Sequence, residues 1–346
     1  MSQRLIAACI AGPLALILAG VALAVPLPYG SYSPGPTFDI LGKDANQAEL
    51  VQVDGHKAYY DKGQIRFTTV LASGYDDRLS LGTAVFGWLN RDEAVVPYNI
   101  VHPPNVSKAD ENAEGAVQMT TSQDVATAVA MTELGLDVPE AVQVALVEKD
   151  GPASKSLLLR DIFLKIDDKP VTSSQDVIDG VQNHEGPGPV EFTILRDGKE
   201  KIVRVVPKVE KGKKKKIGVY LGLGYEFPFK VKLRVDPNVG GPSAGLMFSL
   251  AIYDTLTPGS LTGGEVVAGT GELGPNGQVG PIGGIQQKIA GAQKAGAKLF
   301  FVPKDNCPDV KDLDPDLRLV KATTMHEARV ALQKWSKDRD ATLPAC

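Results

Sequence analysis

Hydrophobic residues follow three different patterns along this chain of 346 residues. Residues 5–25 carry no charge and are almost all apolar. Short apolar runs separated by turn residues then fill the region from about 141 to 206, which is typical of strands. Further on, apolar positions recur every three to four residues, as on one face of a helix. The pattern therefore predicts an N-terminal apolar helix, a strand-rich block and a mixed C-terminal block.

The N-terminal apolar stretch is about 20 residues long, which is enough to cross a bilayer as a helix. Arg4 precedes it, and no further positive charge occurs before Lys43. By the positive-inside rule, this arrangement predicts a cytoplasmic N-terminus and an extracytoplasmic body at the cell membrane. Two alternatives are a signal peptide cleaved after Ala22-Leu23-Ala24 and a buried core helix. We favour a single-pass anchor that contacts the lipid bilayer, formed by residues 1–26.

Residues 27–118 have a mixed pattern. Pro26 to Pro36 is rich in Pro and Gly and is interpreted as a tether. Residues 65–70 predict a strand, and residues 81–89 predict a short helix. Helical signals return with Ser122 as a candidate N-cap, and continue to about Leu134.

The strand-rich block contains predicted strands at 142–147 and 162–166, a short helix at 174–181, and a hairpin around Asp197-Gly198. It resembles a PDZ domain of the bacterial protease-associated type over residues 119–209. The resemblance rests on Gly151-Pro152-Ala153, on the run from Leu158 to Ile166, and on Lys169-Pro170-Val171. It implies a small β-sandwich that binds peptide C-termini through a carboxylate loop at Leu134, Gly135 and Leu136. One departure is Arg160, which stands where the family usually has Gly; the alternative is a PDZ-shaped spacer.

Composition narrows the function. The formal net charge of -4 argues against a nucleic-acid binder driven by bulk charge. Three cysteines are too few for a disulfide-built fold, and four histidines leave little material for histidine-based catalysis. Residues 210–216 form a lysine-rich linker, either solvated or in contact with anionic lipid.

The sharpest chemical signal is the Gly-rich segment from Asp236 to Phe248, which follows a predicted strand at 230–235 and precedes an apolar helix. This order predicts that Ser243 lies at a helix N-terminus, with Pro242 at the first helical position. Unpaired backbone N–H groups at such a place can stabilise an oxyanion. The alternative is that Ser243 only caps the helix.

A second helix carries the candidate partner of Ser243. Ile285, Ile289 and Ala292 form an apolar stripe, and Lys288 lies on that same face whereas Lys294 does not. Burial lowers the pKa of a lysine, and a neutral amine can act as the general base for a serine hydroxyl. The alternative is a lysine whose head reaches the solvent.

These segments resemble the proteolytic domain of Lon-type (S16) proteases over residues 217–335. The resemblance rests on Gly241-Pro242-Ser243-Ala244-Gly245, on Gly269 to Leu273, on Gly280 to Lys288, and on the runs 295–297 and 301–306. It implies a Ser243–Lys288 catalytic dyad, a supporting hydroxyl at Thr270, and oxyanion donors around Gly241, Pro242, Ser243 and Ala244. Pro242 has no N–H and counts by position only. Gly240 replaces the acidic residue that usually precedes the motif, so substrate specificity does not transfer.

Several absences complete the sequence prediction. The sequence has no G-x-x-x-x-G-K-[ST] phosphate loop and no H-E-x-x-H or paired C-x-x-C motif. We therefore expect an enzyme that is independent of ATP, with no cofactor and no catalytic metal. His326 is expected at the start of a terminal helix, outside any triad. Cys307 and Cys346 either form a disulfide or remain free thiols.

The predicted fold is α+β, with an N-terminal transmembrane helix, a PDZ domain at 119–209, a Lon-type domain at 217–336 and a tail at 337–346. We further hypothesise that residues 37–118 supply opening strands of the protease domain, through contacts between 65–70 and 230–235. The predicted function is a membrane-anchored serine endopeptidase acting on protein or peptide substrates, with a PDZ domain that presents or gates them. A homo-oligomeric ring is implied by resemblance. The rival is a non-catalytic PDZ/Lon-like scaffold that binds protein C-termini.

Overall fold

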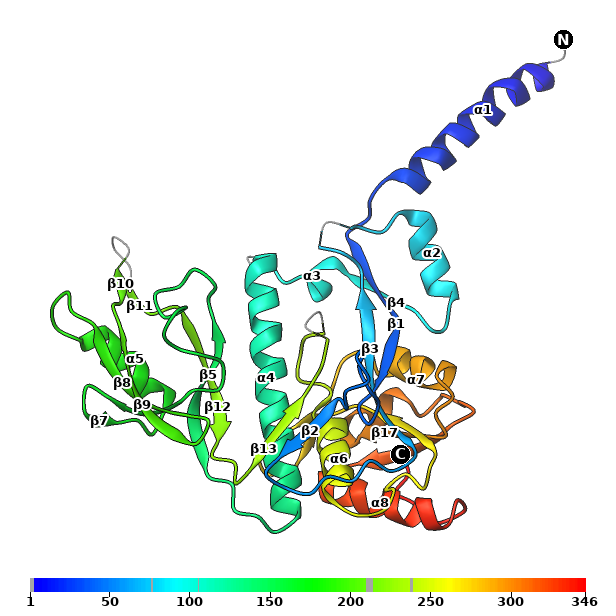
Figure 1. Ribbon diagram of the computed structural model, residues 1–346. Coiled ribbons are helices and arrows are strands. Elements are labelled where there is room, and N and C mark those ends of the chain that lie inside the picture. The colour runs from blue at the N-terminus through cyan, green and yellow to red at the C-terminus, as the bar shows by residue number, and fades with distance from the viewer. Residues whose placement is uncertain (1–2, 76, 105, 210–213, 237–238) are drawn as a thin grey trace.

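The computed structural model describes residues 3–346 except 76, 105, 210–213 and 237–238. Residues 1–2 of the predicted anchor, 210–213 of the predicted linker and 237–238 of the Gly-rich segment therefore lie outside the described residues. The described chain is a mixed α/β structure in two units, with the long helix α4 (Lys108–Glu133) between them (Figure 1).

The larger unit is built on a six-stranded sheet with the order β18-β17-β14-β3-β1-β4. Strand β3 runs parallel to β14, which continues parallel to β17 and β18, whereas β1 is antiparallel to both β3 and β4. Three strands from the C-terminal part of the chain therefore form one half of the sheet, and three strands from the N-terminal part form the other half. Its strands are β1 (Tyr29–Asp39), β3 (Gln64–Ala72), β4 (Ala94–Pro97), β14 (Val266–Gly269), β17 (Leu299–Pro303) and β18 (Arg318–Ala322).

Alternating side chains of this sheet bury two cores on its opposite faces. Val267 and Phe301 pack with α4, α6 (Gly245–Leu256) and α8 (Met325–Lys337). Ala268 and Phe300, one position along each strand, pack instead with α7 (Ile285–Lys294). Because successive strand residues point to opposite faces, the sheet holds α6 on one side and α7 on the other.

The Pro/Gly-rich segment interpreted as a tether is mostly strand β1. Its pairing with β3 shifts register between Pro34 and Thr37, and its pairing with β4 covers only Tyr29 to Tyr32. Proline lacks an N–H donor and is tolerated at bulges and where a strand has no second neighbour. Pro34 and Pro36 therefore lie where the sheet needs no backbone N–H donor from them.

The strands at 65–70 and 230–235 do not pair with each other. Instead β13 (Lys230–Leu233) pairs antiparallel with β2 (Val51–Asp54), while Ile65 of β3 lies opposite Val267 of β14. Residues from the segment 37–118 thus enter the same sheet and the same core as the C-terminal block, but through other pairs than expected.

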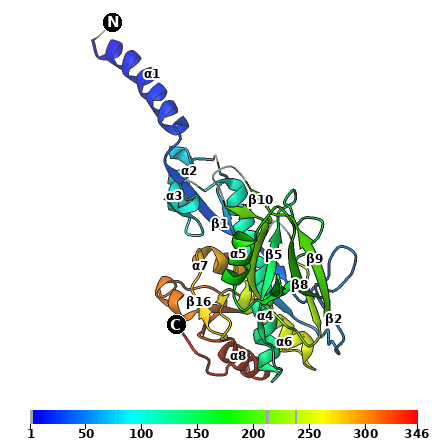
Figure 2. The ribbon, with the colours of Figure 1, turned by 90° about the vertical axis from the view of Figure 1, so that its left-hand side faces the viewer.

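The smaller unit is an antiparallel sheet with the order β12-β5-β6-β8-β9, with β7 beside β6 and helix α5 (Ser174–Asn183) against it (Figure 2). The predicted hairpin is present: Arg196 pairs with Lys199, and Asp197 and Gly198 both have positive φ. Two-residue hairpin loops favour that conformation. The strands are β5 (Glu140–Val147), β6 (Ile162–Ile166), β7 (Lys169–Pro170), β8 (Val190–Arg196), β9 (Lys199–Val205) and β12 (Val219–Tyr225).

Helix α1 (Gln3–Ala24) extends away from both units (Figures 1 and 2). A membrane-spanning helix needs about 20 predominantly apolar residues. Over the described residues, no helix combines the length and the apolar character that crossing a bilayer requires. The predicted N-terminal transmembrane helix, and with it the predicted single-pass location at the cell membrane, was therefore wrong.

Shorter elements complete the chain. Cys307 and Cys346 form a disulfide with a Cα–Cα distance of 5.1 Å, which ties the C-terminal segment to the 3-10 turn η1. The remaining elements are α2 (Leu81–Leu89), α3 (Tyr98–Val101), η1 (Lys304–Asp309), and the strand pairs β10 (Lys208–Val209) with β11 (Lys215–Lys216) and β15 (Glu272–Leu273) with β16 (Val279–Gly280).

Candidate active site

Ser243 lies in the tight turn just before α6. The helix begins at Gly245 with Ala244 as its N-cap, so Ser243 and Pro242 precede the helix rather than open it as the sequence predicted. Gly241 has φ of +90°, a conformation that glycine adopts without steric cost. The turn places the hydroxyl of Ser243 beside α7, although α7 packs on the opposite face of the sheet from α6.

Lys288 reaches this hydroxyl from the end of the first turn of α7. Its Nζ lies 2.9 Å from Oγ of Ser243. The side chain is only 2% exposed, as the apolar stripe predicted, whereas Lys294 on the other face pairs at the surface with Asp92. The distance lies within the hydrogen-bond reach, about 2.6–3.2 Å, that a nucleophile and its base require.

Thr270 completes a chain of hydroxyls around the amine. Its Oγ1 donates to the carbonyl oxygen of Ser243 at 2.9 Å and lies 3.1 Å from Nζ of Lys288. A threonine hydroxyl has one proton. Because that proton is used on the Ser243 carbonyl, Oγ1 accepts an N–H of Lys288, and this orients the amine.

Burial sets the ionisation of Lys288. Desolvation lowers the pKa of Lys288 from 10.5 to about 8. The described ion pairs include no carboxylate partner for this amine. Without a counter-charge, burial disfavours the ammonium form. A substantial fraction of the amine is therefore neutral near pH 8.

The backbone around Ser243 is held at several points. Its carbonyl also accepts the N–H of Gly271 at 2.8 Å. The N–H of Gly241, one of the predicted oxyanion donors, donates to the carbonyl of Gly115 in α4 at 3.1 Å. In this arrangement Gly241 is thus engaged, and Ser243 and Ala244 are the other predicted donors at the helix start.

A cleft of about 360 Å³ opens in front of Ser243 and Lys288. One wall is the part of β3 from Thr68 to Leu71, and the other includes Val239 and Gly240. β14 pairs with β3 only as far as Phe67. Beyond Phe67, β3 therefore presents a strand edge to the cleft, which sequence reasoning missed because it had not paired β3 with β14.

The three residues predicted as a PDZ carboxylate loop lie at the C-terminal end of α4 and do not line the pocket of the smaller unit. Gly135 has φ of +81°, its N–H donates to Thr132, and the N–H of Leu136 donates to Met131. This is the hydrogen-bond pattern of a glycine-terminated helix, here the end of α4. Leu134 and Leu136 pack against the core of the larger unit. Leu134, Gly135 and Leu136 therefore cap α4.

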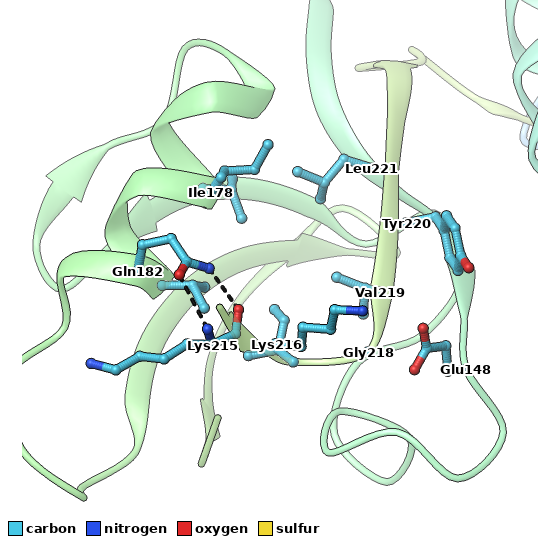
Figure 3. A pocket seen from close by; sticks show the side chains of 12 residues that line it. Glu148, Ile178, Gln182, Lys215, Lys216, Gly218, Val219, Tyr220 and Leu221 are labelled. Carbon is cyan, nitrogen blue, oxygen red and sulfur yellow. Dashed lines mark hydrogen bonds between the residues drawn. The ribbon is translucent and has the colours of Figure 1, made fainter. Parts of the chain in front are cut away.

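The groove of the smaller unit is formed by other residues. A pocket of about 250 Å³ lies between α5 and β12, closed at one end by Lys215 to Gly218 (Figure 3). Gln182 holds this end: its Nε2 donates to the carbonyl of Lys215 at 2.6 Å, and its Oε1 accepts the N–H of Lys215 at 3.1 Å. The sequence signal that could have found it is Lys216-Ile217-Gly218-Val219, a glycine-containing turn directly before the edge strand.

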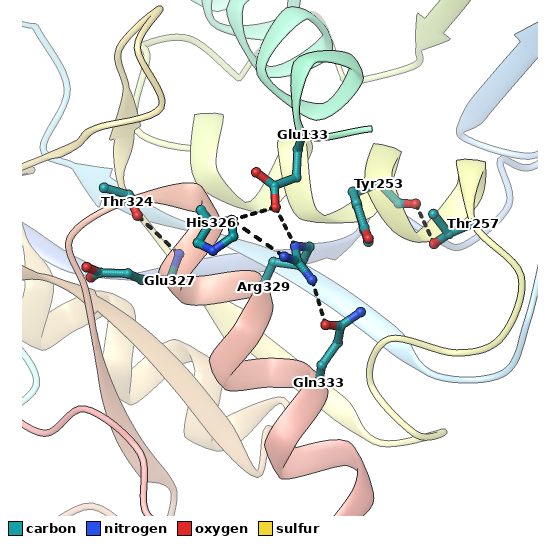
Figure 4. A network of polar contacts seen from close by, with 8 residues as sticks. All are labelled: Glu133, Tyr253, Thr257, Thr324, His326, Glu327, Arg329 and Gln333. Carbon is teal, nitrogen blue, oxygen red and sulfur yellow. Dashed lines mark hydrogen bonds and ion pairs between the residues drawn. The ribbon is translucent and has the colours of Figure 1, made fainter. Parts of the chain in front are cut away.

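His326 takes no part in the cleft. It lies in the first turn of α8, as expected, and its Nδ1 is 2.8 Å from Oε1 of Glu133 (Figure 4). Arg329 donates to the same carboxylate at 2.7 Å. This network joins the C-terminal end of α4 to α8.

Ser122 has a different place from the one predicted. Helix α4 begins at Lys108 with Ser107 as its N-cap, so Ser122 lies in the middle of the helix. Its Oγ donates to the carbonyl of Pro242 at 3.1 Å. Sequence reasoning missed this contact, because the two residues are 120 positions apart.

Comparisons with known proteins match both units. Residues 237–331 match the Lon protease (S16) C-terminal proteolytic domain, and residues 116–206 match the PDZ domain. The chain thus carries a domain similar to that of serine-type endopeptidases. The predicted resemblance to Lon proteases and PDZ domains is confirmed; the membrane anchor that accompanied it is not.

Two curated relatives and one solved structure illustrate the similarity. The Lon protease of Mycolicibacterium smegmatis is 42% identical over 77 residues, which cover 22% of this chain and 10% of the relative. Lon protease 1 of Bacillus subtilis is 34% identical over 103 residues, covering 28% of this chain and 13% of the relative. The matched region thus spans about a tenth of the curated relatives' length. The crystal structure of the PDZ domain of the SdrC-like protein from Listeria monocytogenes is 26% identical, with a TM-score of 0.22, and the match covers 23% of this chain and 86% of that one.

Proposed function

We propose that this protein is a serine endopeptidase that works without ATP, with Ser243 as nucleophile and Lys288 as general base. The observation that carries the proposal is the 2.9 Å approach of a buried amine to a serine hydroxyl at the start of a helix. The match of residues 237–331 to the Lon proteolytic domain supports it independently.

The reaction begins with the neutral amine of Lys288. It accepts the proton of the Ser243 hydroxyl while Oγ attacks the peptide carbonyl carbon. Thr270 keeps the amine in place, because its Oγ1 accepts a hydrogen bond from an N–H of Lys288. The resulting ammonium then donates its proton to the leaving amine, so the peptide C–N bond breaks and an acyl-enzyme forms. Lys288, now neutral again, takes a proton from water while the water oxygen attacks the ester carbon. The ammonium then returns this proton to Oγ of Ser243 as the ester C–O bond breaks, and the acid product leaves.

Negative charge on the attacked carbonyl oxygen needs nearby donors. The backbone N–H groups of Ser243 and Ala244 lie at the N-terminal end of α6, where peptide dipoles favour negative charge. The N–H of Gly241 becomes a further donor if its hydrogen bond to the carbonyl of Gly115 breaks. Each such donor contributes to rate because it stabilises charge that develops only in the transition state.

The cleft fits an extended peptide. The edge of β3 from Thr68 to Leu71 borders Ser243, and an extended substrate can add to such an edge by main-chain hydrogen bonds. Backbone pairing of this kind accepts many sequences. We therefore propose cleavage of unfolded or loop segments, which can adopt the extended conformation that such pairing requires.

The PDZ unit is proposed to present these substrates. The groove between α5 and β12 has the shape for an added strand, with the Lys215–Gly218 turn at its end as the candidate site for a peptide carboxylate. The residues of 37–118 that share the sheet with β14 are proposed to belong to the protease domain, with the PDZ unit inserted within it.

The proposal is tested by cleavage of casein by the wild type, Ser243→Ala, Lys288→Ala and Lys294→Ala. Lys294 is the matched control, since it lies on the same helix but pairs at the surface with Asp92. We expect cleavage by the wild type and Lys294→Ala only. If Ser243→Ala cleaves casein as fast as the wild type, Ser243 is not the nucleophile. Activity absent from all four proteins under several conditions would instead favour a non-catalytic scaffold.

A further inference from the structure

Helix α4 holds the loop that carries the nucleophile, residues 239–244, at two adjacent points. The hydroxyl of Ser122 donates to the carbonyl of Pro242 at 3.1 Å, and the carbonyl of Gly115 accepts the N–H of Gly241 at 3.1 Å. Ser122 is only 5% exposed. The helix thus fixes the chain directly before Ser243.

The first of these contacts bears on the oxyanion site. The peptide bond between Pro242 and Ser243 is planar, so the direction of its carbonyl determines the direction of the Ser243 N–H. That N–H is one of the proposed oxyanion donors. Ser122 therefore controls the orientation of the donor without contacting substrate.

The backbones of α4 and the nucleophile loop also approach closely. A Cβ added to Gly240 would lie 3.3 Å from Cα of Gly115, which leaves little room for a side chain. Gly240 is the position where Lon-type proteases usually have an acidic residue. The close approach gives a physical reason for glycine here and shows that the loop is fitted to α4.

Side chains of the PDZ unit bind α4 next to Ser122, through hydrogen bonds and an ion pair. Nε of Arg160 donates to Oδ1 of Asp124 at 2.8 Å, and a further guanidinium N–H donates to Gln123 at 3.0 Å. Gln143 of β5 donates to the other carboxylate oxygen of Asp124 at 2.5 Å. Asp124 is 3% exposed, so its charge depends on these partners.

Arg160 pays a conformational cost to make this contact. Its φ is +67°, in the left-handed region. For a residue other than glycine this conformation is sterically unfavourable. Glycine, which PDZ domains of this type usually carry here, would avoid the strain but has no guanidinium. Strained residues persist where surrounding contacts over-determine them, and here those contacts are with α4.

The far end of α4 is anchored as well. Glu133 is bound by His326 and Arg329 of α8, and the ring of Tyr253 in α6 lies 5.2 Å from the Arg329 guanidinium carbon (Figure 4). With this end held, loss of the Arg160 contact would act on the middle of α4, where Ser122 lies, and on the preceding turns that carry Gly115.

We propose that Ser122 is a positioning residue for the nucleophile loop, and that the Arg160–Asp124 ion pair couples this helix, and so the active site, to the PDZ unit. The kinetic consequence rests on the proposed protease function. The structural consequence, a loop held by α4, does not depend on it.

The test uses the full chain and three variants. Ser122→Ala removes the hydroxyl. Arg160→Gly/Asp124→Asn removes the ion pair while relieving the backbone strain and leaving no buried carboxylate unpaired. Thr127→Val is the matched control, because Thr127 is equally buried in α4 but its hydroxyl donates to Gln123 within the same helix. Amide hydrogen exchange of peptides covering 239–246 is measured for each protein, together with kcat and KM for a short peptide substrate that cannot reach the PDZ groove.

We expect exchange in residues 239–246 to become several-fold faster in Ser122→Ala and in the double variant, and to be unchanged in Thr127→Val. A displaced donor weakens transition-state binding, so kcat should fall roughly 10-fold in Ser122→Ala and less in the double variant. The midpoint of the pH profile should stay unchanged, since Lys288 itself is not altered.

The outcomes separate this proposal from the proposed function. Wild-type exchange in both test variants, or equal acceleration in Thr127→Val, would overturn the positioning role. Faster exchange in the test variants of a chain that cleaves nothing would support the positioning role and refute the protease function. Faster exchange with an unchanged kcat would overturn the claim that this positioning serves catalysis.

Discussion

The two units hold a cationic side chain in opposite ways: Arg196 of the smaller unit is half-buried beside a buried carboxylate, whereas Lys288 of the larger unit is buried with no carboxylate among its described partners. In the smaller unit, Arg196 donates to both carboxylate oxygens of Asp161, which is 1% exposed. The pKa of Arg196 is raised, chiefly by its hydrogen bond to Asp161. In the larger unit, Lys288 meets only two hydroxyls among its described contacts, and burial lowers its pKa to about 8.

The difference separates structure from chemistry. A buried charge with a fully bonded counter-charge stabilises one geometry and has little tendency to exchange a proton. Burial without a counter-charge destabilises the ammonium form of an amine. The neutral form, which a general base needs, is then more populated near neutral pH.

Replacement of the buried lysine should separate activity from stability. In Lys288→Met, proteolysis should fall by about 1,000-fold or more, because the general base is lost. Stability at pH 7 should rise by roughly 2 kcal/mol, since the buried charge is replaced by an apolar side chain of similar shape. Peptide cleavage and urea unfolding measure the two effects. A variant that is both inactive and less stable would contradict the description of Lys288 as a destabilised base.

Replacement of the paired arginine should do the reverse. Arg196→Met leaves the Asp161 carboxylate buried without its partner, which should cost on the order of 3–5 kcal/mol in unfolding free energy. The double variant Arg196→Met/Asp161→Leu should recover much of this loss. Cleavage of a short peptide by the folded fraction should be retained. Loss of that cleavage in a folded Arg196→Met protein would show that the pair serves the active site.

Thr270→Val should have an intermediate effect. The valine keeps the shape but neither accepts from Lys288 nor donates to the Ser243 carbonyl, so kcat should fall roughly 10- to 100-fold. The matched control is Ser249→Ala, a buried hydroxyl of α6 with no hydrogen-bond partner among the described residues. A kcat of Thr270→Val equal to that of the control would exclude a role in orienting the amine.

The smallest expected effect concerns Asp254 in α6. Burial raises the pKa of Asp254 from 3.8 to about 6, with a smaller contribution from nearby Asp61. The folded protein therefore binds more protons than the unfolded chain between these values, and stability from this group is lost as the pH rises from about 4 to 6. Asp254→Asn should flatten that part of the stability curve, measured by thermal unfolding against pH. An unchanged slope would contradict this assignment.

The sequence predicted the burial of Lys288 better than the surroundings of the site. The stripe of Ile285, Ile289 and Ala292 was enough to place Lys288 on a buried face, because helical periodicity is local information. The same reasoning could not show that β3 joins β14, or that Ser122 bonds to Pro242. Those contacts depend on tertiary packing between distant segments.

Local motifs also misled where two structures share one sequence signal. Leu134-Gly135-Leu136 suits both a carboxylate loop and a glycine-terminated helix, and packing of both leucines on the larger core decided for the helix. Pro34 and Pro36 suggested a tether, yet a register shift accommodates them within β1. The apolar N-terminal run predicted a membrane span that the described helices do not provide.

The proposed role of Lys288 as a neutral base on Ser243 can be tested by the second-order rate at which a small phosphonate reagent modifies Ser243. This rate is followed from pH 6 to 10, where the chemical step itself is observed. We expect the logarithm of the rate to rise with unit slope and to level off near pH 8, the pKa of Lys288. A rate that stays constant from pH 6 to 9 would contradict it.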